Sequence, residues 1–168
     1  MTQKITAAIA LAIVCLLAFG CQTYVNIPPQ DKDTANHNPN GKTVRTVMAL
    51  AVRAALDDGG ITRPVQVMFP ENTNKLSYAQ IISAIGDQAV SPYQEDVSRV
   101  EGVVFAKGVR IRGTRAEVDV ARPVGDGVDQ LVTVYLTWKP LSSWHADRVH
   151  TWRGVAIDES AASASPKP

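Results

Sequence analysis

The sequence predicts an α+β fold in which two main helices pack on a four-stranded antiparallel meander. Two observations support this fold class. In the first half of the chain, apolar residues recur at a spacing of three to four, as in amphipathic helices. From Val100 onward they alternate with polar or small residues, as in strands that bury one face. Because the helices precede the strands, we expect both helices to cover one face of a single sheet.

The order of compositions along the chain predicts four segments. They are a signal peptide at 1–20, a cysteine with a flexible tether at 21–42, a globular domain at 43–158 and a disordered tail at 159–168. Residues 22–42 contain three prolines among polar residues, and the tail is built mainly from Ala, Ser and Pro. Such compositions bury too little apolar surface to offset the entropy lost on ordering. We therefore expect the tether to hold the domain well away from its point of attachment.

The first 21 residues have the layout of an export signal. Lys4 provides the basic start, and residues 5–19 form an almost unbroken apolar stretch. This stretch is shorter than the roughly 20 apolar residues of a spanning helix. Residues 18–20 (Ala-Phe-Gly) fit ordinary small-x-small cleavage, which would release a soluble protein. Residues 17–21 (Leu-Ala-Phe-Gly-Cys), however, resemble the lipobox of bacterial lipoproteins.

The lipoprotein resemblance implies a lipid anchor at Cys21. In that family a thioether joins the cysteine to diacylglycerol, and the cleaved chain then begins at an acylated cysteine with three acyl chains in all. Two or more chains hold a protein stably on a membrane. Gly20 matches the family pattern, whereas Ala18 and Phe19 depart from its preferred Leu and Ala or Ser. Gln22 is not the aspartate that often retains such proteins in the inner membrane, which favours the outer membrane where a cell has two.

The second cysteine, Cys15, lies within the apolar stretch of the signal. Cleavage before Cys21 leaves 168 − 20 = 148 residues with one cysteine, which the lipid consumes. The mature domain is therefore expected to have neither a disulfide nor a thiolate nucleophile, and to be stable through its apolar core alone.

Two helices and a short strand are predicted in the first half of the domain. The first helix covers about residues 43–57 and ends at Gly59-Gly60, since glycine favours helix C-termini. The second begins at residues 77–80 (Ser-Tyr-Ala-Gln), which fit a capping box. Between the helices, alternating apolar residues over 64–69 predict a short strand that Pro70 closes.

Four strands are predicted after Val100. Gly113-Thr114 suits a two-residue type II′ turn between the first two. Pairing across this turn sets apolar residues opposite each other on one face and opposite charges on the other. The expected pairs are Ile111–Ala116, Arg110–Glu117 and Val109–Val118. The third strand covers 130–139, and the fourth roughly 146–157.

The order of these elements resembles that of cystatin-like and nuclear-transport-factor-2-like folds, in which a curved sheet cups a helix or a pocket. The resemblance rests on element order alone and lends no function. A separate alternative function is a small hydrolase or isomerase that uses the concavity of the sheet as a pocket between helices and sheet. That alternative requires His150, Asp119 or Tyr135 to lie within hydrogen-bond distance of one another in the cavity.

Arg148, His150 and Trp152 form the candidate binding face, because alternate residues of a strand share one side. They either line a small groove or simply half-cover the outer face, with Arg148 in solvent. His145 and His150 are expected on opposite strand faces, so we predict no metal site and no cofactor.

The function predicted from these observations is a non-enzymatic binding or assembly module of the bacterial cell envelope. Its expected partners are the membrane, through the lipid, and an envelope component that the sequence does not name. A formal net charge of +1 argues against nucleic-acid binding. We also expect Arg110 to face water, so that Arg110→Glu would cost less than about 1 kcal/mol.

Overall fold

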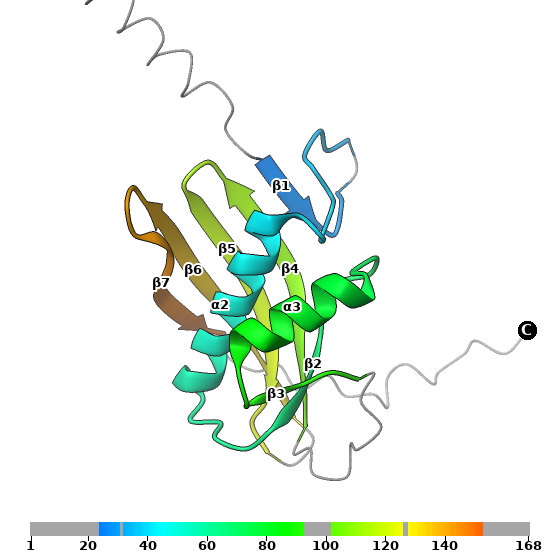
Figure 1. Ribbon diagram of the computed structural model, residues 1–168. Coiled ribbons are helices and arrows are strands. Elements are labelled where there is room, and N and C mark those ends of the chain that lie inside the picture. Colours follow the sequence, from blue (N-terminus) through cyan, green and yellow to red (C-terminus); the bar gives the residue numbers. More distant parts are fainter. Residues whose placement is uncertain (1–23, 31, 93–101, 126–127, 153–168) are drawn as a thin grey trace, which may run out of the picture.

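The computed structural model describes residues 24–30, 32–92, 102–125 and 128–152 (Figure 1). Helices α2 (Lys42–Asp58) and α3 (Lys75–Ile85) lie side by side over one face of a curled, half-barrel sheet. The strands are β1 (Tyr24–Ile27), β2 (Val65–Met68), β3 (Ala89–Val90), β4 (Val103–Arg112), β5 (Arg115–Pro123), β6 (Asp129–Lys139) and β7 (Ser143–Thr151). Their order is β3-β2-β4-β5-β6-β7, and β1 pairs with the second half of β4.

The predicted fold class is wrong, because the sheet is larger than a four-stranded antiparallel meander and is mixed. It has seven strands, and β2 runs parallel to both β3 and β4. Strands β4 to β7 are antiparallel neighbours but form only part of it. The described part of the chain is therefore mostly β, with two helices. Strands β1, β2 and β3 have only two to four residues each, too few to show a clear period of two.

The tether predicted at 21–42 is wrong over the part that the structure describes. Residues 24–27 form β1, in which Val25 and Ile27 are buried in the core. The polar residues that follow stabilise local turns: side chains of Asp33 and Asn36 accept hydrogen bonds from backbone N–H groups two residues further on. Such Asx hydrogen bonds order a segment that has few apolar side chains. Low apolar content therefore did not mean disorder here.

The core lies between the two helices and the inner face of the sheet. Helix α2 crosses strands β4 to β7 and buries one apolar face completely, including Met48 and Leu56. Helix α3 adds Ile81 and Ile85 and packs on α2 and β3. Its N-cap is Asn74 rather than Ser77, so the helix begins three residues earlier than a cap at Ser77 predicts. These aliphatic side chains fill the space between the helices and the sheet, so the inner face of the sheet stabilises the fold.

Arg122 of β5 attaches the end of α2 to the sheet. Its buried guanidinium donates to the carbonyl of Ala55, pairs with Asp58 at 2.9 Å and donates to Gln130 at 3.2 Å. The last turn of α2 has no basic residue of its own, so Arg122 supplies the cation that a helix C-terminus favours. A Cβ at Gly59 would lie 3.0 Å from this guanidinium, so a larger residue there would require the guanidinium to shift.

The β4–β5 hairpin has the predicted register. Val109 pairs with Val118, Arg110 with Glu117 and Ile111 with Ala116, so this prediction is confirmed. The last strand is described only to Thr151, and its predicted extension to residue 157 lies outside the described residues, as do the predicted signal peptide and the predicted tail. Within the described ranges, neither helix has the length and apolar character needed to cross a bilayer.

Candidate functional site

Arg148, His150 and Trp152 lie together on the face of the sheet that no described helix covers. The guanidinium carbon of Arg148 is 4.4 Å from the centre of the Tyr135 ring, a cation–π contact between neighbouring strands. The rings of His150 and Trp152 meet edge to face with centroids 4.7 Å apart. All three side chains are exposed, so the predicted shared face exists.

A hydrogen-bonded chain continues from Trp152, which directly follows β7, across β6, β5 and β4. The indole N–H of Trp152 donates to the Thr133 hydroxyl at 2.9 Å, and that hydroxyl donates to Asp119 at 2.7 Å. Asp119 also accepts two hydrogen bonds from Arg110, at 2.7 and 3.1 Å. The Nε of Arg110 donates to Glu117 at 3.1 Å. We call these five side chains the outer-face network.

The electrostatics of this network favour its ionised form. Burial opposes ionisation of Asp119, but hydrogen bonds from Arg110 and Thr133 outweigh it and hold the pKa of Asp119 below its ordinary value. The hydrogen bonds to Asp119 in turn raise the pKa of Arg110. A carboxylate held charged by a guanidinium is a poor general base. The network therefore ties β4, β5 and β6 to the residue that follows β7.

The geometry required by the enzyme alternative differs from what the structure shows. Asp119, Tyr135 and His150 belong to the face opposite the helices, whereas apolar side chains occupy the space between helices and sheet. Within the described part of the chain, these three side chains contact Arg110, Arg148 and Trp152 rather than one another.

The described residues include no group of three or more His, Cys, Asp or Glu side chains arranged to hold a metal ion. The prediction that His145 and His150 lie on opposite faces of the strand is wrong. The register of β7 shifts between its partners Tyr135 and Leu136, so that His145 and His150 both pair with threonines of the same β6 face. Their partners, Thr137 and Thr133, are four residues apart, which separates the histidines by about 13 Å along the strand.

A groove of about 710 Å³ opens where β1 and β2 end against the same edge of β4. Strand β2 pairs with β4 over residues 103–105 and β1 over residues 109–112, so neither covers the intervening residues 106–108. We call this hollow the strand-gap groove. It is lined by Ile27, Pro28, Pro29, His37, Met68, Phe69, Pro70, Glu71, Asn72, Phe105, Ala106 and Lys107.

The lining of the strand-gap groove is mainly apolar. Prolines close both strands, which prevents β1 or β2 from extending across the gap because proline has no N–H to donate. Tyr78 of α3 fixes the position of Phe69 in the lining. Its hydroxyl accepts a hydrogen bond from the Phe69 N–H at 3.1 Å, and its ring packs edge to face on the Phe69 ring. Lys107 and Glu71 add charges of opposite sign.

Sequence reasoning missed this groove because its lining comes from four separate segments. The only local signal was that two apolar strands both end in proline, at Pro28 and Pro70.

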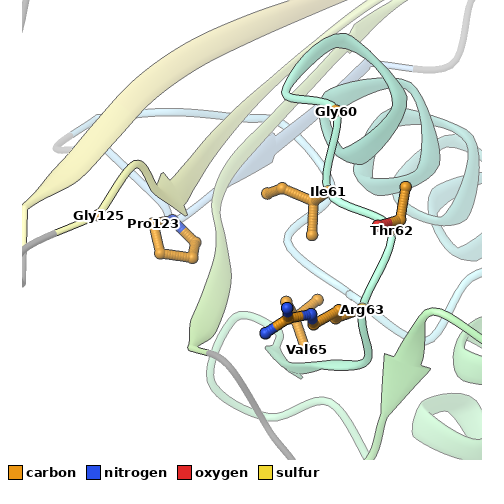
Figure 2. Close-up of a pocket in the computed structure, with 7 residues that line it drawn as sticks. All are labelled: Gly60, Ile61, Thr62, Arg63, Val65, Pro123 and Gly125. Atoms are coloured by element: carbon orange, nitrogen blue, oxygen red, sulfur yellow. The ribbon is translucent and has the colours of Figure 1, made fainter.

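A second, smaller hollow of about 410 Å³ lies where α2 leads into β2. Figure 2 shows Ile61, Arg63 and Pro123 around its opening. It is lined by Gly60, Ile61, Thr62, Arg63, Val65, Pro123 and Gly125. Gly125 is followed directly by residues 126–127, which lie outside the described residues. The strand-gap groove is the better-defined candidate.

Comparison of the chain with protein-family models, with curated proteins and with solved structures finds no match.

Proposed function

We propose that this protein is a lipid-anchored lipoprotein of the bacterial cell envelope that acts as a non-enzymatic binding or assembly module. The anchor rests on the lipobox-like residues 17–21, which end at Cys21. The binding role rests on the strand-gap groove. Its volume lies within the roughly 300–1,000 Å³ of typical ligand sites, and its apolar lining with a few polar groups is typical of them.

The groove suits an apolar segment of an envelope partner. Phe69, Phe105 and Met68 offer flat and flexible apolar surface, while Lys107 and Glu71 can orient polar ends of the bound chain. The filled space between helices and sheet supports binding over catalysis, because a small pocket enzyme on this sheet would need that space open.

Cell fractionation tests the anchor. The full chain, expressed in a bacterial host that processes lipoproteins, should sediment with membranes and incorporate radiolabelled palmitate. Cys21→Ser should lose the label and leave the membrane fraction. An unlabelled, soluble wild-type protein would refute the lipoprotein proposal and favour ordinary secretion.

Site-directed photocrosslinking tests the groove. A benzoylphenylalanine at position 107 should give a discrete adduct in intact cells, and the added substitution Phe105→Asp should remove it by placing a charge in the apolar lining. The matched control position is Arg53, which is exposed on the opposite side of α2 from the core. No adduct at 107, or the same adducts at both positions, would contradict binding in the groove.

A further inference from the structure

The first strand begins almost immediately after the proposed lipid attachment site. Only Gln22 and Thr23 separate Cys21 from Tyr24, the first residue of β1. Three residues of fully extended chain span at most about 11 Å. With acyl chains on Cys21, the start of β1 therefore lies no further from the hydrocarbon core of the bilayer than about the thickness of the headgroup layer. A 22-residue tether would instead allow a long separation between the domain and the bilayer.

The end of the sheet at which β1 begins also contains two hairpin turns (Figure 1). Tyr24 pairs with Arg112, the last residue of β4, and the β4–β5 turn follows. Arg115 pairs with Thr137 near the end of β6, so the β6–β7 turn lies at the same end. Three strand spacings separate β1 from β6, about 15 Å. The start of β1 and the β4–β5 and β6–β7 turns are therefore all close to the lipid attachment site.

This end exposes large apolar and aromatic side chains. Tyr24 and Trp138 are each 39% exposed, and Leu141 is fully exposed at the tip of the β6–β7 turn. Leu141 also has a backbone φ of 72°, in the left-handed region that glycine or asparagine adopts more readily. A fully exposed leucine in that conformation buries no apolar surface in the isolated domain. Its presence points to a partner outside the chain.

The same end is positively charged. Arg112, Arg115 and Lys139 are exposed, and the turn segments 112–115 and 137–144 contain no Asp or Glu. The guanidinium of Arg112 lies 5.7 Å from the centre of the Tyr24 ring. Two acidic residues lie near this end. Asp147 of β7 accepts a hydrogen bond from Thr137 and pairs with His145, and Asp33 accepts a hydrogen bond from the side chain of Asn26 in β1.

We propose that this end of the sheet is a membrane-contact surface that lies in the headgroup layer of the bilayer holding the Cys21 lipids. The surface comprises Tyr24, Arg112, Arg115, Trp138, Lys139 and Leu141. Tryptophan and tyrosine concentrate at the level of lipid headgroups, and basic residues there are attracted to anionic phosphates. Leu141 reaches past them toward the acyl chains. This inference rests on the lipid anchor of the proposed function.

Quenching by brominated lipid tests the contact on the full, processed protein. The protein is reconstituted into vesicles of phosphatidylethanolamine and phosphatidylglycerol whose acyl chains carry bromine near the headgroup. One variant keeps only Trp138 (Trp144→Phe, Trp152→Phe), and its matched control keeps only Trp152 (Trp138→Phe, Trp144→Phe). Trp152 follows the opposite end of β7, so it lies away from the proposed surface.

Trp138 emission should fall by more than about half, because bromine quenches an indole that lies at the interface. Trp152 emission should be unchanged. Leu141→Asn, in the background that keeps Trp138, should reduce the quenching without lowering the melting temperature, since asparagine tolerates the left-handed conformation.

The mass of the N-terminal peptide, measured on the same sample, separates the two proposals. A lipidated Cys21 with no Trp138 quenching, or with equal quenching of both tryptophans, would overturn the membrane-contact surface and leave the anchor standing. A Cys21 without lipid would overturn the anchor, and the surface with it.

Discussion

Arg110 and Asp119 provide the most informative test of the outer-face network. Arg110→Met removes both hydrogen bonds from Arg110 to Asp119. It leaves that carboxylate, whose side chain is 23% exposed, with the hydrogen bond from the Thr133 hydroxyl at 2.7 Å. Hydrogen bonds to charged groups contribute about 1.5–3 kcal/mol when buried, whereas exposed ion pairs contribute about 0–1 kcal/mol. The partial exposure of this pair therefore predicts a coupling of about 1–2 kcal/mol.

Urea unfolding of wild type, Arg110→Met, Asp119→Asn and the double variant measures that coupling directly. Because the folded pKa of Asp119 lies below its ordinary value of 3.8, the stabilisation should be complete above that value and should be lost as the pH falls through the folded pKa. A coupling below about 0.3 kcal/mol at pH 7 would refute the network as a stabilising feature.

The same pair corrects one expectation from the sequence. Arg110→Glu was expected to cost less than about 1 kcal/mol, but it would place a third carboxylate beside Glu117 and Asp119. It should therefore cost more than Arg110→Met in the same urea experiment.

Three further substitutions test the core and its attachments. Val134→Asp should abolish cooperative thermal unfolding, because Val134 is fully buried and an unpaired buried charge is not compensated; an unchanged melt would show that the strand face is misassigned. Arg122→Met should lower the free energy of unfolding by about 2–3 kcal/mol in urea, since it leaves the last carbonyls of α2 and the carboxylate of Asp58 without their cation; a loss under about 0.5 kcal/mol would contradict that role. Tyr78→Phe should cost about 1–2 kcal/mol by removing the acceptor of the Phe69 N–H, and equal stability of the two proteins would show that this hydrogen bond contributes nothing.

The parts of the fold that the sequence predicted well depend on local signals. The β4–β5 register follows from a two-residue turn and from side-chain parity, and both act over about ten residues. Helix α2 follows from its apolar period and from Gly59 at its end. The shared face of Arg148, His150 and Trp152 follows from the two-residue period of a strand. The register shift in β7 does not disturb this period, because all three residues come after the shift.

The parts that were missed depend on contacts between distant segments. Strand β1 has four residues and is held by pairing with Arg112 and its neighbours in β4, so nothing within residues 24–27 distinguishes it from a loop. The parallel pairing of β2 is missed for the same reason. The strand-gap groove and the outer-face network can be predicted only when the pairing register of the sheet is known, because their side chains come from three or more segments.

The proposed account depends on one covalent bond, between the sulfur of Cys21 and diacylglycerol. Intact-mass spectrometry of the protein extracted from membranes tests it most directly. We predict a chain that begins at Cys21 and carries the added mass of a diacylglyceryl group and an amide-linked acyl chain. A chain with an unmodified Cys21, or one that retains residues 1–20, would contradict the account.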